Sequence, residues 1–264
     1  MLHLKDKGFL TVACIILILF FSIPAKSQKG IVINNPRYDD DIIHFGFVLG
    51  GNMSYLTIRP VADLQQIVWD STYLPSDFLP MPLGARVLSI ESRPTPGFVI
   101  SIVSDLRLGP LFNLRFIPSL SFGDRDLIYS ILVYRKTDTT VMNITKKVPS
   151  TYINFPLEFK YKALRYDNFR PYLLAGVQYT LDLASQAKKR EQRSSDQKIV
   201  KFNQNDLYIE AGVGFDFYNE WFKLAVELKM MYGTQDILKR EHNIFTDPVS
   251  RLNSKIFQLS FTFE

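Results

Sequence analysis

The chain has 264 residues, of which 14% are aromatic, with 21 Phe, 13 Tyr and a formal charge of +5. Aromatic enrichment favours β-structure. A charge this small argues against a protein whose main partner is nucleic acid. The only cysteine, Cys14, lies in an apolar N-terminal run, so the chain beyond that run has no thiol for a disulfide or for thiolate chemistry.

The N-terminal segment has the order of a secretory signal peptide. Two early lysines precede an apolar run at residues 9–23, and small residues follow at 25 and 27. We expect cleavage after residue 27, which leaves 28 basic and 25 acidic residues and a formal charge of +3. Residues 28–41 then form a periplasmic lead-in, which we expect to be a solvated tail, its acidic run at 39–41 included. No later stretch has the 18 consecutive apolar residues of a transmembrane helix.

The last ten residues alternate strictly between two kinds of side chain. Phe257, Leu259, Phe261 and Phe263 are separated by single polar residues. A period of two is that of a β-strand with one apolar and one polar face. In a closed barrel such a last strand pairs with the first, and no edge remains open.

Seven further stretches with this alternation precede the last one. We expect strands at residues 43–52, 98–108, 112–122, 153–162, 173–181, 207–217 and 222–230. Pro118 has no N–H to donate, so it requires a bulge or kink in the third of them. The proline-rich segment 56–96 is expected to be a loop, as are residues 187–205 and 233–254. A further long segment runs from the third strand to about residue 150, and the connections between these long segments are short. Residues 127–134 are expected to extend a strand beyond the membrane.

Eight strands joined by alternately long and short connections are typical of bacterial outer-membrane barrels. The prediction is an all-β, eight-stranded antiparallel transmembrane barrel over residues 42–264. It lies in the outer membrane, with both termini and the short turns in the periplasm. Its direct surroundings are outer-membrane lipids and lipopolysaccharide.

The bulk of the apolar faces indicates which side points inward. An eight-stranded ring is only wide enough for side chains to fill it, and about forty large apolar residues would overfill it. The apolar faces therefore point to lipid, and the charged faces pair inside, because buried charges need partners. The predicted interior charge network consists of Asp105, Arg107, Arg115, Glu158, Lys160, Lys162, Glu210, Asp216, Lys223, Glu227 and Lys229. Such a filled interior is not a diffusion pore.

Few residues offer catalytic chemistry. The mature chain has two histidines, His44 and His242, and His242 has Glu241 and Ser250 near it in the sequence. A lipid A-modifying enzyme would need one of these histidines as its base. Two histidines without cysteine do not make a transition-metal site. We expect no enzyme activity, cofactor, metal or small-molecule substrate. The basic stretch 188–190 is either a solvated loop or a contact to lipopolysaccharide.

The first long connection is unusually apolar for a solvated loop. Its candidate contact residues are Trp69, Tyr73, Phe78 and Leu79. Two interpretations fit: these side chains pack on one another over the barrel mouth, or they form a surface for another protein. Both require an ordered loop.

Several short motifs, in their order, resemble the PorT family of Bacteroidetes outer-membrane barrels, called SprT in gliding bacteria. They are HFGFVLG at 44–50, PGF at 96–98, DLRL at 105–108, LRFIP at 114–118, FGDR at 122–125, FPLEFKYK at 155–162 and RPYLLAG at 170–176. Ala163 departs from the family, where a Ser follows KYK.

This resemblance implies a component of the type IX secretion system, which exports proteins and supports gliding motility. Its partners would be other type IX secretion proteins, and the family carries no catalytic residues. The function we expect is a structural or assembly factor of that machinery rather than its conduit. The alternatives are a generic OmpA-like barrel that stabilises the envelope and a lipid A-modifying enzyme.

Overall fold

The computed structural model describes residues 32–74, 82–136, 138–183 and 200–264. The chain divides into two units, residues 1–33 and 34–264, and the description below concerns the second. The predicted signal peptide lies outside the described residues. Among the described residues, no helix is long and apolar enough to cross a membrane.

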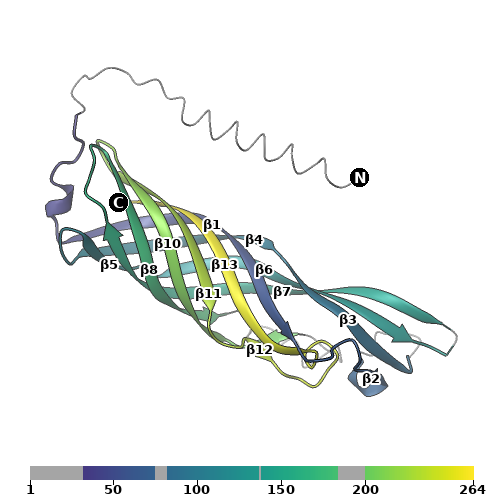
Figure 1. Ribbon diagram of the computed structural model, residues 1–264. Coiled ribbons are helices and arrows are strands. Elements are labelled where there is room, and N and C mark those ends of the chain that lie inside the picture. Colours follow the sequence, from purple (N-terminus) through teal and green to yellow (C-terminus); the bar gives the residue numbers. More distant parts are fainter. Residues whose placement is uncertain (1–31, 75–81, 137, 184–199) are drawn as a thin grey trace, which may run out of the picture. The chain divides into compact units, whose positions relative to one another are not determined.

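Eight antiparallel strands form a ring in chain order (Figure 1). The ring strands are β1 (Ile43–Pro60), β4 (Thr95–Arg107), β5 (Phe112–Phe116) continued by β6 (Ser119–Tyr134), β7 (Thr139–Lys162), β8 (Phe169–Asp182), β10 (Asn205–Tyr218), β11 (Lys223–Gly233) and β13 (Val249–Phe263). β1 pairs with β4 on one side and with β13 on the other, where Phe47 lies opposite Phe263. The last strand therefore pairs with the first, as the sequence predicted, and each ring strand has two neighbours.

The predicted irregularity at Pro118 is confirmed. The strand is interrupted between β5 and β6 at Ile117 and Pro118. Ile117 turns into the interior, where it is buried with Val48 and Val103. Its N–H donates to the carbonyl of Pro156, and the carbonyl of Pro118 accepts from Ile102, so the interruption keeps its hydrogen bonds to both neighbouring strands.

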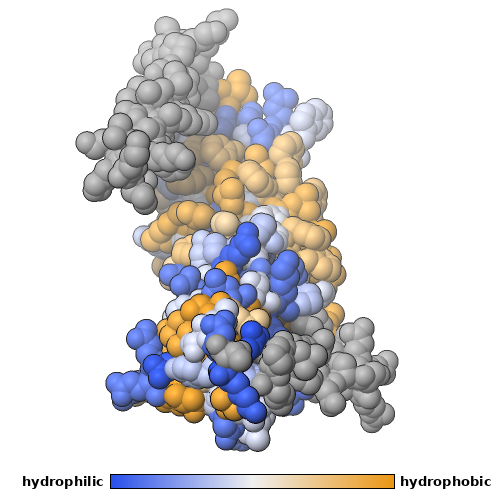
Figure 2. Space-filling model, turned by 90° about the vertical axis from the view of Figure 1, so that its right-hand side faces the viewer, coloured by the Kyte–Doolittle hydropathy of each residue, from blue (hydrophilic) through white to orange (hydrophobic). Residues whose placement is uncertain are grey.

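The ring wall is apolar outside and polar inside. Large exposed side chains alternate along the strands, for example Phe45, Phe47 and Leu49 on β1, while the intervening positions turn inward. Figure 2 shows this as an orange surface over the ring, set behind a mainly hydrophilic end nearest the viewer. The predicted direction of the two faces is thus the observed one.

All three segments expected to be loops contain strands. Within residues 56–96 lie the end of β1, β2 (Trp69–Asp70), the 3-10 turn η2 (Ser71–Tyr73) and β3 (Gly84–Arg93). β3 pairs with β6, but a bulge between Val87 and Ser89 breaks its alternation, which is why the pattern did not indicate it. Near the end of the chain, β12 (Leu238–Lys239) pairs with β9 (Lys201–Phe202), and β13 begins at Val249 rather than after residue 254.

β6 and β7 continue together past the ring, and the predicted extension at residues 127–134 is confirmed. One face of this extension carries its own apolar core with β3 and the loops. Tyr129 of β6 packs edge-on against Phe245, and its hydroxyl donates to the Phe245 carbonyl at 2.8 Å. We call this end of the ring the far end. The opposite end, where residues 34–42 and Glu264 lie, is the lead-in mouth.

Candidate functional site

The eleven residues predicted to form the interior network lie on facing walls of the ring. Ten of them have buried side chains, and Arg107 is half-buried at the lead-in mouth. Their inward direction follows from strand parity, because each alternates with an outward apolar residue. What they can do depends on which partners the ring brings together.

Arg115 is the centre of the network. Its guanidinium lies 2.7 Å from Glu227 and 3.4 Å from Glu158, which come from β11 and β7. Lys229 pairs with Glu158 at 2.6 Å, and the hydroxyl of Tyr172 donates to Glu227 at 2.7 Å. These charges neutralise one another across the ring instead of lining an open passage.

A second group lies nearer the lead-in mouth. Lys160 pairs with Asp216 at 2.9 Å and lies 3.9 Å from Asp105, which also accepts a hydrogen bond from Asn113. Lys223 pairs with Glu264. Glu264 and Asn113 were not among the predicted network residues, although both occupy inward positions of the alternation.

Glu210 is the exception within the network. Its carboxylate is buried, yet neither oxygen has a hydrogen-bond partner among the described residues. It lies opposite Gly176 of β8, which leaves room for it. The structure thus brings ten of the eleven predicted residues into polar contacts and leaves Glu210 without one.

Above this network, towards the far end, the interior is polar without charge. Asn154 donates to Ser119 and accepts from Thr180, and Asn52 donates to Ser121, all at 2.9–3.0 Å. A small cavity among these groups measures about 10 Å³, room for about one water molecule. The sequence search for charged groups missed this layer, although its residues follow the same alternation.

Beyond that layer lies Arg125, which was not among the residues predicted for the interior network. Its guanidinium donates to the Tyr208 hydroxyl at 3.1 Å and lies 4.6 Å from the centre of the Tyr152 ring. Two buried aspartates, Asp182 and Asp206, interact electrostatically with Arg125 at this level of the ring. The interior is therefore packed with side chains at successive levels between its two ends.

The predicted lead-in is described from residue 32 onward, and from here on the term lead-in means residues 34–42. These residues are not the solvated tail that the sequence suggested. They include the 3-10 turn η1 (Tyr38–Asp40) and lie across the lead-in mouth. Asp39 accepts two hydrogen bonds from Arg170, at 2.6 and 2.7 Å, and lies 3.9 Å from Lys162. Of the acidic run, only Asp40 and Asp41 are exposed. The prediction of a solvated tail was wrong because it rested on local composition, whereas the partner of Asp39, Arg170, is 131 residues away in the chain.

Tyr38 fixes the lead-in beside Asp39. Its ring stacks on His44 with centroids 4.0 Å apart, and its hydroxyl donates to Glu264. The ammonium of Lys223 lies 4.6 Å from the centre of the Tyr38 ring. The packing leaves a cavity of about 10 Å³ at this point.

The backbone of the lead-in is held as well. Arg165 donates to the carbonyls of Asn34 and Asn35. The Asn34 N–H donates to the side chain of Asn168, and the side-chain amide of Asn35 donates to the carbonyl of Asn219. Arg107 donates to the Asp39 carbonyl through its guanidinium and to the Ile42 carbonyl through its N–H. The lead-in is thus bound by side chain and main chain together.

Burial, which disfavours the charged form, raises the pKa of Asp39. The hydrogen bonds and charge of Arg170 and the charges of Lys162 and Lys223 outweigh burial, so the net pKa lies below its usual 3.8. Asp39 is therefore ionised at neutral pH and acts as the anion of this mouth.

The predicted contact residues of the first long connection separate into two pairs. Trp69 is buried in the far-end core, and Tyr73 packs against that core. Phe78 and Leu79 lie outside the described residues, as does the basic stretch 188–190. Trp69 and Tyr73 are thus packed at the far end, and contact of this connection with another protein stays a prediction.

The structure does not bring His44, or His242 with Glu241 and Ser250, together into a catalytic arrangement. Ser250 donates to the Arg59 carbonyl, and Glu241 pairs with Lys201 at 2.7 Å. His242 is 90% exposed with Asp247 at 4.0 Å, and His44 is stacked on Tyr38. No cluster of three or more His, Cys, Asp or Glu suited to a metal occurs among the described residues.

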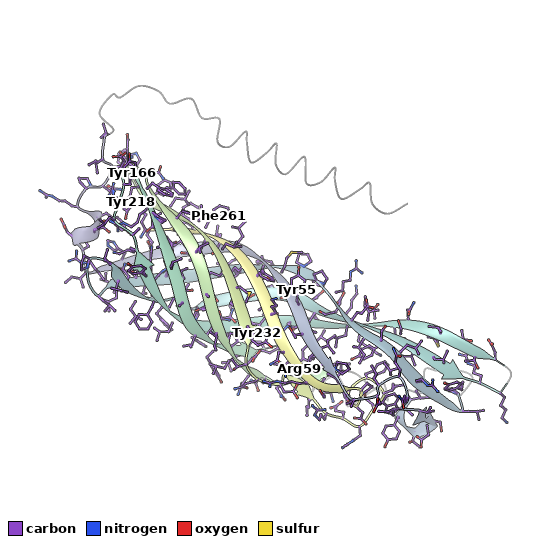
Figure 3. All side chains as sticks on the ribbon, viewed as in Figure 1. Tyr55, Arg59, Tyr166, Tyr218, Tyr232 and Phe261 are labelled. Carbon is purple, nitrogen blue, oxygen red and sulfur yellow. The ribbon has the colours of Figure 1, made fainter. Side chains whose placement is uncertain are left out.

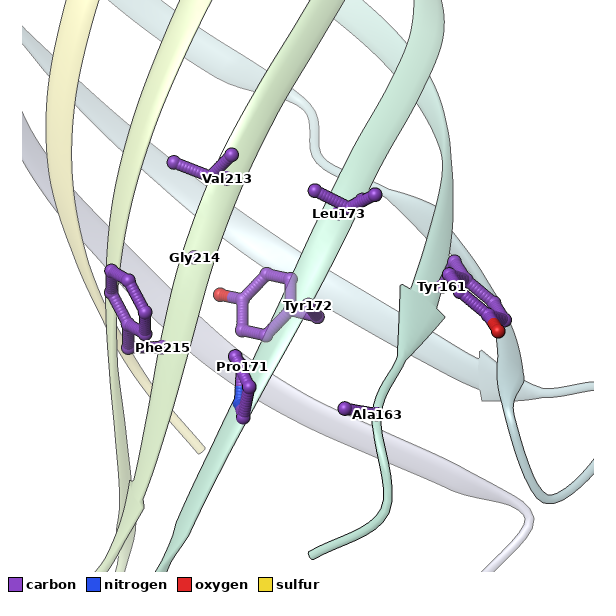
Figure 4. A pocket seen from close by; sticks show the side chains of 8 residues that line it. All are labelled: Tyr161, Ala163, Pro171, Tyr172, Leu173, Val213, Gly214 and Phe215. Atoms are coloured by element: carbon purple, nitrogen blue, oxygen red, sulfur yellow. The ribbon is translucent and has the colours of Figure 1, made fainter.

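An apolar hollow of about 310 Å³ lies on the outer wall between β7, β8 and β10 (Figure 4). Leu173, Val213 and Phe215 line it, and small residues such as Ala163 make the room. It offers no acid, base or metal ligand. Beyond it, the turns at the lead-in mouth expose Tyr166 (labelled in Figure 3) and Trp221, the residue types that favour a membrane–water interface.

An antiparallel ring with an apolar outside and a charged, packed inside defines an outer-membrane β-barrel protein. The chain belongs to the outer membrane protein beta-barrel domain family, which it matches over residues 35–239. It is accordingly a protein of the outer membrane. No curated protein matches the chain significantly.

Solved structures of outer-membrane proteins resemble the chain at low sequence identity. OprG from Pseudomonas aeruginosa is 13% identical, with 83% of this chain and 92% of OprG covered and a TM-score of 0.33. The outer membrane protease OmpT from Escherichia coli is 11% identical, with 84% and 96% covered and a TM-score of 0.37. TM-scores this low carry no inference about function.

Proposed function

We propose that this barrel is a non-conducting component of the type IX protein secretion machinery, with a structural or assembly role, and that it is not an enzyme. The observation that carries the non-conducting part is the packed interior. Ion pairs such as Arg115–Glu227 cross the ring, and the lead-in lies across one mouth. A folded protein has no path through such a ring. The secretion role is supported by the resemblance of the motifs quoted above to the PorT family.

The same proposal places the lead-in mouth in the periplasm. The connections at this end are short, as between β10 and β11 at residues 219–222, whereas those at the far end are long and carry a core of their own. Short periplasmic turns and long external loops are the rule for outer-membrane barrels. The wall would contact outer-membrane lipids, and the far end would contact lipopolysaccharide and secretion partners.

The test is to compare the secreted and periplasmic proteins of a deletion strain with those of its parent and of a complemented strain. Cargo trapped in the periplasm, with an intact envelope, is the expected result. Normal secretion from a leaky envelope would contradict the secretion role and favour a generic barrel that stabilises the envelope. An Arg115→Met variant that is still inserted is tested for complementation as well. Restored secretion would mean that the barrel is needed but its rigid interior is not, and failure to restore it would mean that the interior is needed too.

A further inference from the structure

The lead-in mouth has an imbalance of charge that only the lead-in corrects. Among the described residues, Arg170 and Lys162 have no carboxylate other than Asp39 within ion-pair distance. Arg107 likewise uses its guanidinium on the lead-in, at the Asp39 carbonyl. Without residues 34–42, Arg107, Lys162 and Arg170 would line one small cavity without an ion-pair partner among the described residues. The other charged residues that line it are already paired, Asp216 with Lys160 and Lys223 with Glu264. This is an anion site that the chain fills with its own segment.

The site recognises more than a charge. The ring of Tyr38 enters a slot formed by His44 and Tyr218, under the ammonium of Lys223. Arg165 and Arg107 donate to main-chain carbonyls of the lead-in. A free phosphate would satisfy Arg170 and Lys162 but would leave the aromatic slot and the carbonyl donors unused. The contacts therefore fit an extended peptide with a tyrosine followed by an aspartate.

The lead-in is held in a way that allows exchange. None of its residues is buried, and Asp40, Asp41 and Ile42 point to solvent. Docking thus depends on polar contacts and one aromatic ring rather than on a buried apolar core. Its advantage over a free peptide is its tether, which gives it an effective concentration of about millimolar.

We propose that the lead-in mouth is a peptide-binding site for an acidic, tyrosine-containing segment of another protein, and that the lead-in occupies it in cis as a displaceable occupant. The occupant's carboxylate takes the place of Asp39 on Arg170, and its aromatic ring takes the place of Tyr38. This proposal goes beyond the secretion role and does not depend on it, because the site is defined by contacts within this chain.

The test uses the full-length mature protein in detergent and a fluorescent peptide with the sequence of residues 34–42. An opened variant, Tyr38→Ala with Asp39→Ala, removes the two anchors of the cis segment. We expect it to bind the peptide with an affinity at least about tenfold higher than the parent, whose tethered lead-in competes. Anisotropy of the labelled peptide measures binding, and the heat-dependent gel mobility of a folded barrel verifies folding.

Two peptides with the same net charge make the matched control. Changing Asp39 to Asn in the peptide removes the charge that Arg170 holds, and we expect about 10- to 100-fold weaker binding. Changing Asp41 to Asn removes an exposed charge and is expected to leave binding unchanged. On the protein side, Arg170→Lys in the opened variant should weaken binding, because a lysine cannot make both hydrogen bonds, whereas Arg93→Lys should not.

Several results would overturn the proposal. A folded opened variant that binds no peptide would do so, as would equal losses from the two Asn peptides, which indicate only general charge attraction. Inorganic phosphate or phosphatidylglycerol in the micelles that binds more tightly than the peptide would point instead to a small-anion or a lipid headgroup site. None of these results bears on whether deletion of the protein blocks secretion, so the two proposals fail separately.

Discussion

Arg115 on β5 and Glu227 on β11 are 112 residues apart in the chain, and their charged groups lie 2.7 Å apart across the ring. Both side chains are buried, and Glu158 on β7 and Lys229 on β11 join them. A buried ion pair contributes little net stability compared with an apolar substitute, but loss of one partner leaves the other charge buried and unpaired. The network therefore constrains what each of its members can become.

The first prediction follows from that asymmetry. Arg115→Met is expected to lower the free energy of unfolding by about 3–5 kcal/mol, because the buried carboxylate of Glu227 loses its close ion-pair partner and Glu158 keeps only Lys229. Denaturant titration of the protein in lipid vesicles measures the loss. Arg93→Met, a change at an exposed arginine, is the control and should leave the midpoint almost unchanged. Equal midpoints for the two variants would mean that the interior charges are solvated.

Gly214 of β10 faces the ring interior, where the ring of Tyr172 lies against it (Figure 4). A Cβ at this position would overlap the Tyr172 side chain, whose hydroxyl is held by Glu227. Gly214→Ala is therefore expected to destabilise the barrel by about 1–3 kcal/mol. Gly109→Ala is the matched control, because nothing lies within 4 Å of its added Cβ. If both variants unfold at the parent's midpoint, Tyr172 yields without cost.

Two apolar side chains with almost the same exposure test where the membrane lies. Leu228 is 54% exposed on the ring wall, and Val141 is 53% exposed on the part of β7 that continues past the ring. Leu228→Arg is expected to cost about 2–4 kcal/mol if it faces the middle of the bilayer. Val141→Arg should be tolerated, since that surface meets water. Folding yield into vesicles and the denaturation midpoint measure both, and equal costs would contradict the proposed position of the bilayer.

Much of this arrangement follows from alternation alone. Parity places Arg115 and Glu227 inside the ring and Leu228 outside it. The pairing of β1 with β13 follows from the need to leave no open edge. Which cation meets which carboxylate does not follow, because the distance from Arg115 to Glu227 depends on the register and stagger of strands far apart in the chain.

Other parts of the fold had no periodic signal. The bulge after Val87 hides β3, and the lead-in is too short to show a period, so neither the far-end sheet nor the contact of Asp39 with Arg170 was predicted. Trp69 was recognised as ordered, but only packing decides whether such a side chain faces a core or a partner.

Trp69 and its neighbour Val68 allow that decision to be tested. Trp69 is 7% exposed within the far-end core, whereas Val68 is 54% exposed. Trp69→Ala is expected to cost about 3–5 kcal/mol locally and to open the first long connection to protease while the ring stays folded. Val68→Ala should leave cleavage at the parent's rate. Protection that is unchanged in Trp69→Ala would contradict a packing role and return this residue to the candidates for partner contact.

The last prediction concerns acid and the docking of the lead-in. The pKa of Asp39 is lowered in the folded protein, because burial, which raises it, is outweighed by Arg170 and two nearby lysines. A carboxylate with a lowered pKa contributes docking free energy above its usual pKa of 3.8 and loses that contribution as the pH falls through the lower folded value. We therefore expect the lead-in to remain docked at pH 5 and to be released only below about pH 4.

A single fluorophore on Asp40→Cys reports this release, because residues 28–264 contain no other cysteine and Asp40 is exposed. Its anisotropy should fall as the lead-in is released. The same label in an Asp39→Asn background should be mobile at every pH, because the asparagine amide has no charge to hold Arg170 and none to lose on acidification. A release that starts near neutral pH, or that is the same in the Asn background, would assign the transition to another group at the mouth, such as His44 beneath Tyr38.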